Sequence, residues 1–308
     1  MGRVEIIEVS PRDGLQNEAV LVSTVDKARL IRESIAAGFG RIEVTSFAHP
    51  RWVPQMADAE ALLAELGPSP DGVVFSTLVL NEKGYERAEA AGVDEINVVI
   101  PTSQTFCEKN QNSTLDRLLD EWHRIANRAR SAGIPASLSF AVAFGCPFEG
   151  EVSIDHLVAA VARGVEAEPA EIALADSIGC AVPTDITTRF NAIREVTGDI
   201  PLRVHLHNTR NSGLANAVAA VAAGVDRLDS SIGGIGGCPF APAATGNIPT
   251  EDLVWMLERM DVQTGISIAP VLDTAEWIGT VLDKTVPGFM SRAKPFPEVA
   301  RAGAEPSS

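Results

Sequence analysis

Two histidines separated by one residue, His205 and His207, carry the strongest chemical signal in this 308-residue sequence, which contains five histidines in all. They end the run PLRVHLH, in which apolar and polar residues alternate. Residues two apart on a β-strand point to the same face, so both imidazoles can bind one cation. Because imidazole is the commonest metal ligand in proteins, the pair predicts a metal site.

The elements that must position this pair alternate between strands and helices. Eight segments have the apolar pattern of strands: 4–9, 41–46, 72–78, 95–100, 136–142, 171–175, 202–207 and 227–230. Seven segments have helical periodicity: 24–37, 53–66, 81–91, 113–132, 153–166, 183–196 and 211–223. Glycines such as Gly38 and Gly133 follow these helices, as left-handed helix caps do.

This alternation predicts a parallel sheet covered by helices. The number of strands and the chain length favour an α/β fold of the (β/α)8 TIM-barrel type, with a short C-terminal helical extension, over an open doubly wound sheet. Residues 1–285 would form this domain, and residues 286–308 an irregular or disordered tail.

Composition excludes several classes of partner. The formal net charge of −16 argues against nucleic acid and against an anionic membrane surface. No apolar run reaches the roughly 20 residues that a membrane helix needs. The four cysteines show no metal-binding spacing, and no targeting segment is evident, so we expect a soluble protein in a reducing cytoplasm.

In TIM barrels the catalytic residues lie at the carboxyl ends of the strands. Asp13 follows the first predicted strand, and with the two histidines it would supply two nitrogens and one oxygen to a cation. About three positions would then stay open for water or substrate. Mg²⁺ or Mn²⁺ fits this prospect, although Zn²⁺, Co²⁺ and Fe²⁺ would also accept two imidazoles. The alternative is that Asp13 is a turn residue before Gly14.

Three more charged residues lie near these strand ends. Glu43 should point into the barrel, where a buried carboxylate needs a partner such as Arg12, a histidine or the metal. An ion pair at the barrel floor is the alternative. Arg12 can stabilise an enolate oxygen or compensate the charge of Glu43. Asp176 can orient a ligand or cap the following helix.

A glycine-rich stretch, GGIGGCPFAPAATGN, follows the last strand and contains Cys238. It does not match the GxGxxG dinucleotide motif, because the second half is absent. Its thiol can act as a general acid or base or be a passive small residue, and the stretch itself leaves both open. We expect His49, His123 and His156 to lie at the surface.

Six segments together resemble the 3-hydroxy-3-methylglutaryl-CoA lyase family of DRE-TIM metallolyases, over residues 4–282: SPRDGLQNE, IEVTSF, FGCPFEG, LADSIG, HLHNT and GGIGGCPFAPAATGNIPTEDLV. The resemblance implies a divalent cation, Mg²⁺ or Mn²⁺, and four residues as ligands or near neighbours: Asp13, His205, His207 and Asn247.

The resemblance also implies roles in catalysis and substrate binding. Arg12 would stabilise the thioester enolate, and Cys238 would donate or shuttle a proton. Glu43 and Asp176 would shape the surroundings of the metal and of the base, and the base would be His205 or a metal-bound water. Residues near the acyl-CoA would be Arg12, Gln16, Lys109 and Asn110. A homo-oligomer, dimer or larger, and a place in leucine degradation are implied as well.

The implied reaction is a retro-Claisen cleavage of 3-hydroxy-3-methylglutaryl-CoA to acetyl-CoA and acetoacetate. Two departures bear on the acyl group. Relatives typically read HDTYG where this chain reads His207-Asn208-Thr209-Arg210-Asn211, and many carry lysine at the position of Ala19. Citramalyl-CoA or a longer branched 3-hydroxyacyl-CoA is therefore an alternative substrate.

Two other classes compete with this interpretation. A condensing synthase of the isopropylmalate or homocitrate type shares the Arg-Asp and HxH features, but the chain lacks a C-terminal regulatory extension. A non-catalytic scaffold has no reason to keep a set of costly buried charges.

Overall fold

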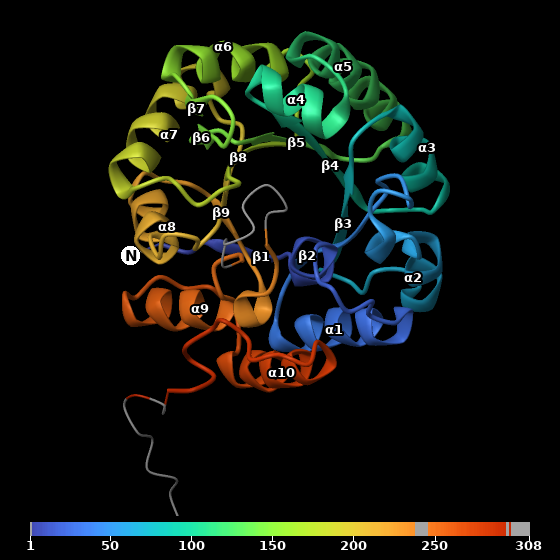
Figure 1. Cartoon of the computed structure of the whole chain (residues 1–308), viewed down its shortest axis with the longest axis vertical. Helices are drawn as coiled ribbons and strands as arrows, with labels where there is room; N and C mark the ends of the chain where they lie inside the picture. The colour runs from blue at the N-terminus through green and yellow to red at the C-terminus, as the bar shows by residue number, and fades with distance from the viewer. Residues whose placement is uncertain (1, 238–245, 294–295, 297–308) are drawn as a thin grey trace, which may run out of the picture.

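The computed structural model describes residues 2–237, 246–293 and 296. Eight parallel strands close into a barrel in the order β1-β10-β9-β8-β5-β4-β3-β2 (Figure 1). The strands are β1 (Glu5–Glu8), β2 (Arg41–Ser46), β3 (Val74–Val79), β4 (Glu95–Pro101), β5 (Ala136–Ala141), β8 (Glu171–Asp176), β9 (Leu202–Leu206) and β10 (Arg227–Ser230). The TIM-barrel prediction is confirmed, and each predicted strand lies within two residues of an observed one.

Helices surround the barrel (Figure 1). They are α1 (Thr24–Ala37), α2 (Ala59–Leu66), α3 (Glu82–Ala90), α5 (Leu115–Ala132), α6 (Ile154–Val165), α7 (Pro183–Thr197), α8 (Gly213–Ala222), α9 (Thr250–Arg259) and α10 (Ile268–Val281). Gly38 and Gly133 cap α1 and α5 with φ of 106° and 73°, as predicted. Among the described residues no helix is both long and apolar enough to cross a membrane.

The prediction of one helix over 53–66 was wrong. A short 3-10 turn, η2 (Pro54–Met56), precedes α2, and the two are separate. Side chains in this stretch bind other segments instead of continuing a helix: Gln55 accepts from the N–H of Val22, and Asp58 pairs with Lys27 at 2.6 Å. These contacts fix the stretch against α1.

Two elements between the predicted ones escaped sequence reasoning. They are helix α4 (Gln104–Gln111) and a small hairpin of β6 (Gly145–Cys146) and β7 (Gly150–Glu151). Only Phe106 and Cys107 of α4 are buried, so the helix lacks the apolar stripe on which helix prediction depends.

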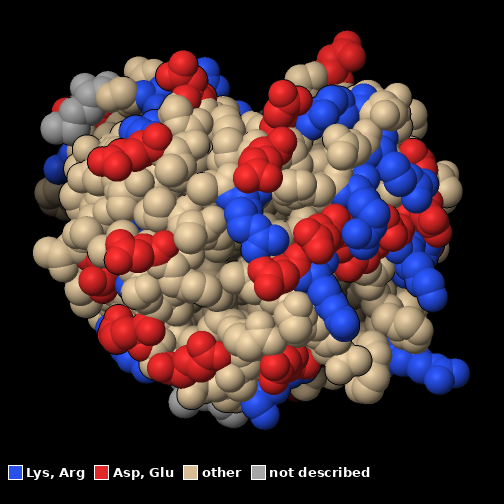
Figure 2. Space-filling model, turned by 90° about the horizontal axis from the view of Figure 1, so that it is seen from above, with Lys and Arg blue, Asp and Glu red and all other residues tan. Residues whose placement is uncertain are grey.

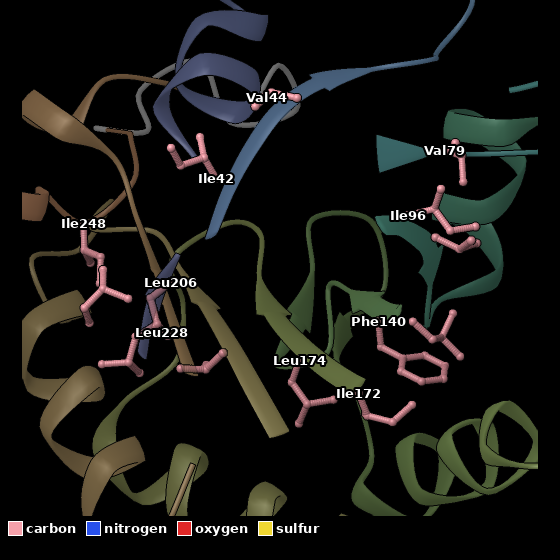
Figure 3. Packing of buried hydrophobic residues seen from close by; sticks show 14 of the residues in the cluster. Ile42, Val44, Val79, Ile96, Phe140, Ile172, Leu174, Leu206, Leu228 and Ile248 are labelled. Atoms are coloured by element: carbon pink, nitrogen blue, oxygen red, sulfur yellow. The ribbon is translucent and has the colours of Figure 1, made fainter. Parts of the chain in front are cut away.

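The apolar core lies between the strands and the helices, as the side chains in Figure 3 illustrate. Strand β9 shows how alternation divides the two sides. Leu202, Val204 and Leu206 belong to the apolar cluster, whereas Arg203 and His205 meet side chains of other strands inside the barrel. Each large apolar side chain buried in this way contributes about 1.5–3 kcal/mol.

A network of buried charges fills the amino-terminal end of the barrel. Glu171, at the start of β8, accepts from Arg41 of β2 at 2.9 Å and from Arg227 of β10 at 2.6 Å. Arg203 lies 3.1 Å from the same carboxylate, and Glu95 of β4 also pairs with Arg41. Each of these charges has an opposite partner, which offsets the cost of burying it.

Charges on the outside are interspersed. On the face drawn in Figure 2, basic side chains lie next to acidic ones and do not gather into one large basic patch. Pairs such as Arg124–Glu82 at 2.9 Å and Arg87–Glu60 at 2.8 Å join neighbouring helices. This surface accords with the net charge of −16 and offers nothing typical of nucleic-acid binding on that face.

Candidate metal centre and active site

The two histidines of the HLH run meet at the carboxyl end of the barrel. His205 lies on β9 and His207 directly after it, and their Nε2 atoms are 3.0 Å apart. The Oδ2 atom of Asp13 lies 3.6 Å from Nε2 of His205 and 3.8 Å from Nε2 of His207. One ligand atom from each residue lies within 4.8 Å of the others, the only such group of three or more His, Cys, Asp or Glu in the described part of the chain.

Asp13 reaches this position through an unusual turn after β1. Residues Ser10–Gly14 form a π-helical turn, η1, a distortion frequent at functional sites. Glu8 holds its start by accepting from the N–H of Ser10 at 2.8 Å. Gly14 lets the end of the turn pack closely against Ser231, because a Cβ on Gly14 would lie 2.8 Å from Oγ of Ser231. The carboxylate of Asp13 therefore faces the histidines, as the metal prediction requires.

Arg12 and Glu43 form the ion pair that sequence reasoning anticipated, at the metal centre and not at the barrel floor. Nε of Arg12 donates to Oε2 of Glu43 at 2.6 Å, and Nη1 of Arg12 donates to Oδ1 of Asp13 at 2.5 Å. Asn97 of β4 donates to the other oxygen of Glu43 at 3.1 Å. One buried guanidinium thus joins the acid of β2 to the acid of the metal cluster.

The electrostatics of the cluster suit metal ligands. Burial would raise the pKa of Asp13, but Arg12 and the two histidines outweigh it and hold that pKa well below its usual range. Burial, together with His205, lowers the pKa of His207 to about 4. Near neutral pH, Asp13 is therefore an anion and His207 a neutral imidazole, the forms that bind cations.

Asp229 of β10 orients His205, and sequence reasoning missed it. Its Oδ2 lies 3.1 Å from Nδ1 of His205, and its other oxygen lies 3.7 Å from Nε of Arg203. Burial opposes protonation of His205, but this hydrogen bond and the charges of Asp229 and Asp13 raise its pKa overall. A proton held on Nδ1 leaves the lone pair of Nε2 facing the cluster.

Asn247 completes the wall of the centre. Its Nδ2 donates to Oδ2 of Asp13 at 2.9 Å and to the carbonyl of Ile235 at 3.2 Å. Two buried atoms of the centre have no hydrogen-bond partner among the described residues: Oδ1 of Asn247 and Nδ1 of His207. An unpaired buried acceptor costs about 1–3 kcal/mol, and an amide oxygen is a good ligand for a hard cation. The donor set therefore fits a divalent metal.

Asp176 lies at the end of β8, opposite Leu206 in the neighbouring strand. Its carboxylate accepts from the backbone N–H groups of Cys180 at 2.8 Å and Ala181 at 3.0 Å. Burial raises its pKa despite these hydrogen bonds. Through these contacts Asp176 stabilises the loop before α7. A direct contact between Asp176 and a ligand stays a prediction.

The remaining predicted site residues are not brought into contact with the cluster. Gln16 is half-buried just after η1, while Lys109 and Asn110 are exposed on α4, which follows the carboxyl end of β4. Nζ of Lys109 lies 5.1 Å from the ring centre of Phe148. Cys238 lies outside the described residues.

Comparison with known proteins places these residues in a family. The model of the HMGL-like family matches residues 3–278. The chain belongs to the HMGL-like family. It is 39% identical to (R)-citramalyl-CoA lyase of Chloroflexus aurantiacus, covering 97% of this chain and 98% of the relative. It is 36% identical to hydroxymethylglutaryl-CoA lyase YngG of Bacillus subtilis, covering 92% and 95%.

A solved structure extends the match to three dimensions. The HMG-CoA lyase of Acinetobacter baumannii, in complex with coenzyme A and 3-methylmalate, superposes with a TM-score of 0.92 at 33% identity. The superposition covers 96% of this chain and 97% of that one. The resemblance drawn from the sequence motifs is thus confirmed, and the protein is a carbon–carbon lyase of this family.

Proposed function

We propose that this protein cleaves 3-hydroxy-3-methylglutaryl-CoA into acetyl-CoA and acetoacetate. The observation that carries the proposal is the buried cluster of Asp13, His205 and His207 with Arg12 bound to Asp13. A cation site with a fixed guanidinium beside it can hold an oxygen that gains negative charge during C–C cleavage. The lyases found among the relatives support this reaction class.

The residues divide the chemistry between them. The sequence offered His205 or a water as the base; because the cation would occupy Nε2 of His205 and Asp229 holds a proton on Nδ1, we propose that a water removes the proton of the tertiary hydroxyl. The C2–C3 bond then breaks, and its electrons form the enolate of acetyl-CoA. The hydroxyl carbon becomes the ketone of acetoacetate, and an acid, for which we propose Cys238, protonates the enolate carbon. Arg12, held by Glu43, faces the developing charge. The cation supplies Lewis-acid stabilisation and a template when bound.

Mg²⁺ or Mn²⁺ is the proposed cation, held by Asp13, His205 and His207 with Asn247 as a further ligand. The oxygen donors and the open positions suit these ions. The predictions of a homo-oligomer, of a cytoplasmic location and of a role in leucine degradation rest on sequence and resemblance, and they stay predictions.

Acetyl-CoA release is the direct test of this proposal. We expect release from 3-hydroxy-3-methylglutaryl-CoA with Mg²⁺, loss of release after EDTA, and recovery when Mg²⁺ or Mn²⁺ is added back. A coupled assay for free acetyl-CoA measures it. Release from this thioester that EDTA leaves unchanged would contradict the metal-dependent mechanism, and no release from it would contradict the proposed substrate.

Citramalyl-CoA is a second candidate, favoured by Arg210. Nη1 of Arg210 donates to the carbonyls of Ile178 at 2.9 Å and Gly179 at 3.0 Å, which ties the loop after β9 to the loop after β8. Relatives with the HDTYG sequence carry tyrosine at this position. Citramalyl-CoA has its carboxylate one carbon closer to the hydroxyl carbon, and we propose that the loop held by Arg210 shapes the pocket for this shorter acid. The 39% identity to (R)-citramalyl-CoA lyase supports this candidate.

Replacing this arginine should change the choice of substrate. We expect Arg210→Tyr to raise the ratio of kcat/KM for 3-hydroxy-3-methylglutaryl-CoA over citramalyl-CoA about tenfold, the effect of roughly 1.4 kcal/mol in differential binding. Initial rates with both thioesters measure the ratio. An unchanged ratio would remove Arg210 from the determinants of specificity.

A further inference from the structure

The glycine-rich segment 233–237 forms one wall of the metal centre. A Cβ on Gly236 would lie 2.7 Å from Nδ2 of Asn247 and 3.1 Å from the backbone oxygen of Asp13. The neighbouring Ile235 accepts from that same Asn247 amide at 3.2 Å. A small displacement of this segment would therefore move Asn247 and the backbone of Asp13 with it.

The QNE end of the SPRDGLQNE motif holds this wall from one side. Nδ2 of Asn17 donates to the carbonyl of Gly237 at 2.7 Å. The N–H of Gly236 donates to Oε1 of Glu18 at 3.3 Å. Two consecutive side chains thus bind two consecutive glycines, and the function described above uses neither side chain.

The segment that follows α10 holds the wall from the other side. Nζ of Lys284 pairs with Oε1 of Glu18, the same oxygen that accepts from Gly236. The N–H of Gly288 donates to the carbonyl of Gly233 at 3.1 Å. Glu251 of α9 accepts from the N–H of Gly233 at 2.9 Å. Residues 284–288 therefore bind the glycine-rich segment directly at Gly233 and, through Glu18, at Gly236.

The start of α9 anchors this C-terminal segment. The carboxylate of Asp252 accepts from the N–H groups of Phe289 at 3.0 Å and of Met290 at 2.7 Å. A Cβ at position 288 would lie against the carboxylate of Glu251, which would have to move away from the N–H of Gly233. Residues 284–290 are thus fastened at one end to α9 and at the other, through Lys284, to Glu18.

We propose that Lys284 and Glu18 are positioning residues of the lyase reaction, through which the segment after α10 sets the place of the glycine-rich wall. Only 13% of the Glu18 side chain is exposed, so its charge needs a counter-ion. With Lys284 removed, the carboxylate gains more by turning to water than by keeping one amide. The N–H of Gly236 would then lose its acceptor. The segment 233–237 would no longer be held in one position.

Hydrogen exchange and kinetics together test this proposal, whose catalytic part rests on the proposed function. In Lys284→Met and Glu18→Ala we expect faster amide exchange in peptides covering 233–237. We also expect kcat to fall about 10- to 100-fold, the cost of a misplacement near 1 Å, with KM for the acyl-CoA unchanged. Glu18→Ala/Lys284→Met should be no worse than Glu18→Ala, and Lys284→Arg should recover most of the rate.

Arg124→Met is the matched control. It removes one cation from a surface pair on α5, Arg124–Glu82, and so changes the net charge equally. It should leave exchange in 233–237, kcat and KM as in the wild type.

Three outcomes would overturn the proposal. A raised KM with unchanged kcat in Lys284→Met would make Lys284 a substrate-binding residue. Additive losses in the double variant would mean that the two residues act separately, and unchanged exchange in 233–237 would remove the mechanical link. If the wild type releases acetyl-CoA from neither thioester, the proposed function fails, while the exchange experiment still decides whether Lys284 positions the wall.

Discussion

His207→Ala should abolish tight Mn²⁺ binding and lower kcat about 10³-fold while the barrel stays folded. The side chain supplies one of three clustered ligand atoms, and its Nε2 lies 3.8 Å from the Asp13 carboxylate. A cation contributes several kcal/mol of stabilisation to charge that develops in such reactions, which corresponds to about this factor in rate. Titration of Mn²⁺ by electron paramagnetic resonance measures the affinity without any substrate.

The same titration has an expected pH dependence. Asp229 and Asp13 raise the pKa of His205, so a proton competes with the cation at this imidazole. Below that pKa, the Mn²⁺ affinity should rise about tenfold per pH unit as one proton is displaced, and above it the affinity should level off.

A urea titration, which measures the free energy of unfolding, should show that the His207→Ala variant is folded.

His123→Ala is the control for this experiment. That ring lies on α5 and contacts the carbonyl of Arg163 at 2.8 Å, away from the cluster. Its Mn²⁺ affinity and kcat should equal those of the wild type. Wild-type metal affinity in His207→Ala would remove this residue from the ligands.

Arg12→Met should lower kcat about 10²- to 10³-fold at saturating metal without weakening Mn²⁺ binding. Its guanidinium carries the one positive charge bound to both Asp13 and Glu43, and a preorganised donor of this kind contributes about this factor. Loss of a cation beside the metal site removes a repulsion, so the affinity for Mn²⁺ should stay equal or increase.

A conservative variant separates charge from geometry at this position. Arg12→Lys keeps the charge, but one ammonium cannot reproduce the two directed contacts to Glu43 and Asp13. We expect a partial recovery, with kcat between those of Arg12→Met and the wild type. If Arg12→Met loses metal and activity in parallel, then Arg12 serves the metal site and not the enolate.

The sequence was informative wherever one periodicity decided the outcome. The alternation in PLRVHLH was enough to place His205 and His207 on one face, because strand residues two apart point to the same side. Parallel strands bring their carboxyl ends to one edge, which is why Asp13 and His207 could be matched across nearly 200 residues. Arg12 was also weighed correctly as the partner of Glu43.

Contacts that depend on the register between strands were beyond sequence reasoning. Asp229 meets His205 because β10 and β9 pair Leu228 with Val204, a register that nothing in either strand specifies alone. Asn97 reaches Glu43 across an intervening strand for the same reason. Both are polar residues inside apolar strand patterns, a signal that marks them as buried and partnered without naming the partner.

The π-helical turn at Ser10–Gly14 was also unpredictable, because its geometry depends on distant groups. Glu8 holds it from β1, and Ser231 leaves no room beside Gly14. A local sequence such as SPRDG is equally compatible with an ordinary turn. Tertiary contacts therefore decide where the Asp13 carboxylate points.

The buried ion pairs of Arg41, Glu171 and Arg203 close the amino-terminal end of the barrel. A ligand can therefore enter only at the carboxyl end. A packed barrel is no channel, so a thioester entering at the carboxyl end has no second exit. Both fragments of a substrate cleaved at the metal centre must therefore leave against the direction of entry. If the thioester binds with its acid end toward the cluster and its CoA part in the opening, the acid fragment leaves second, an order that the bond cleavage itself does not require.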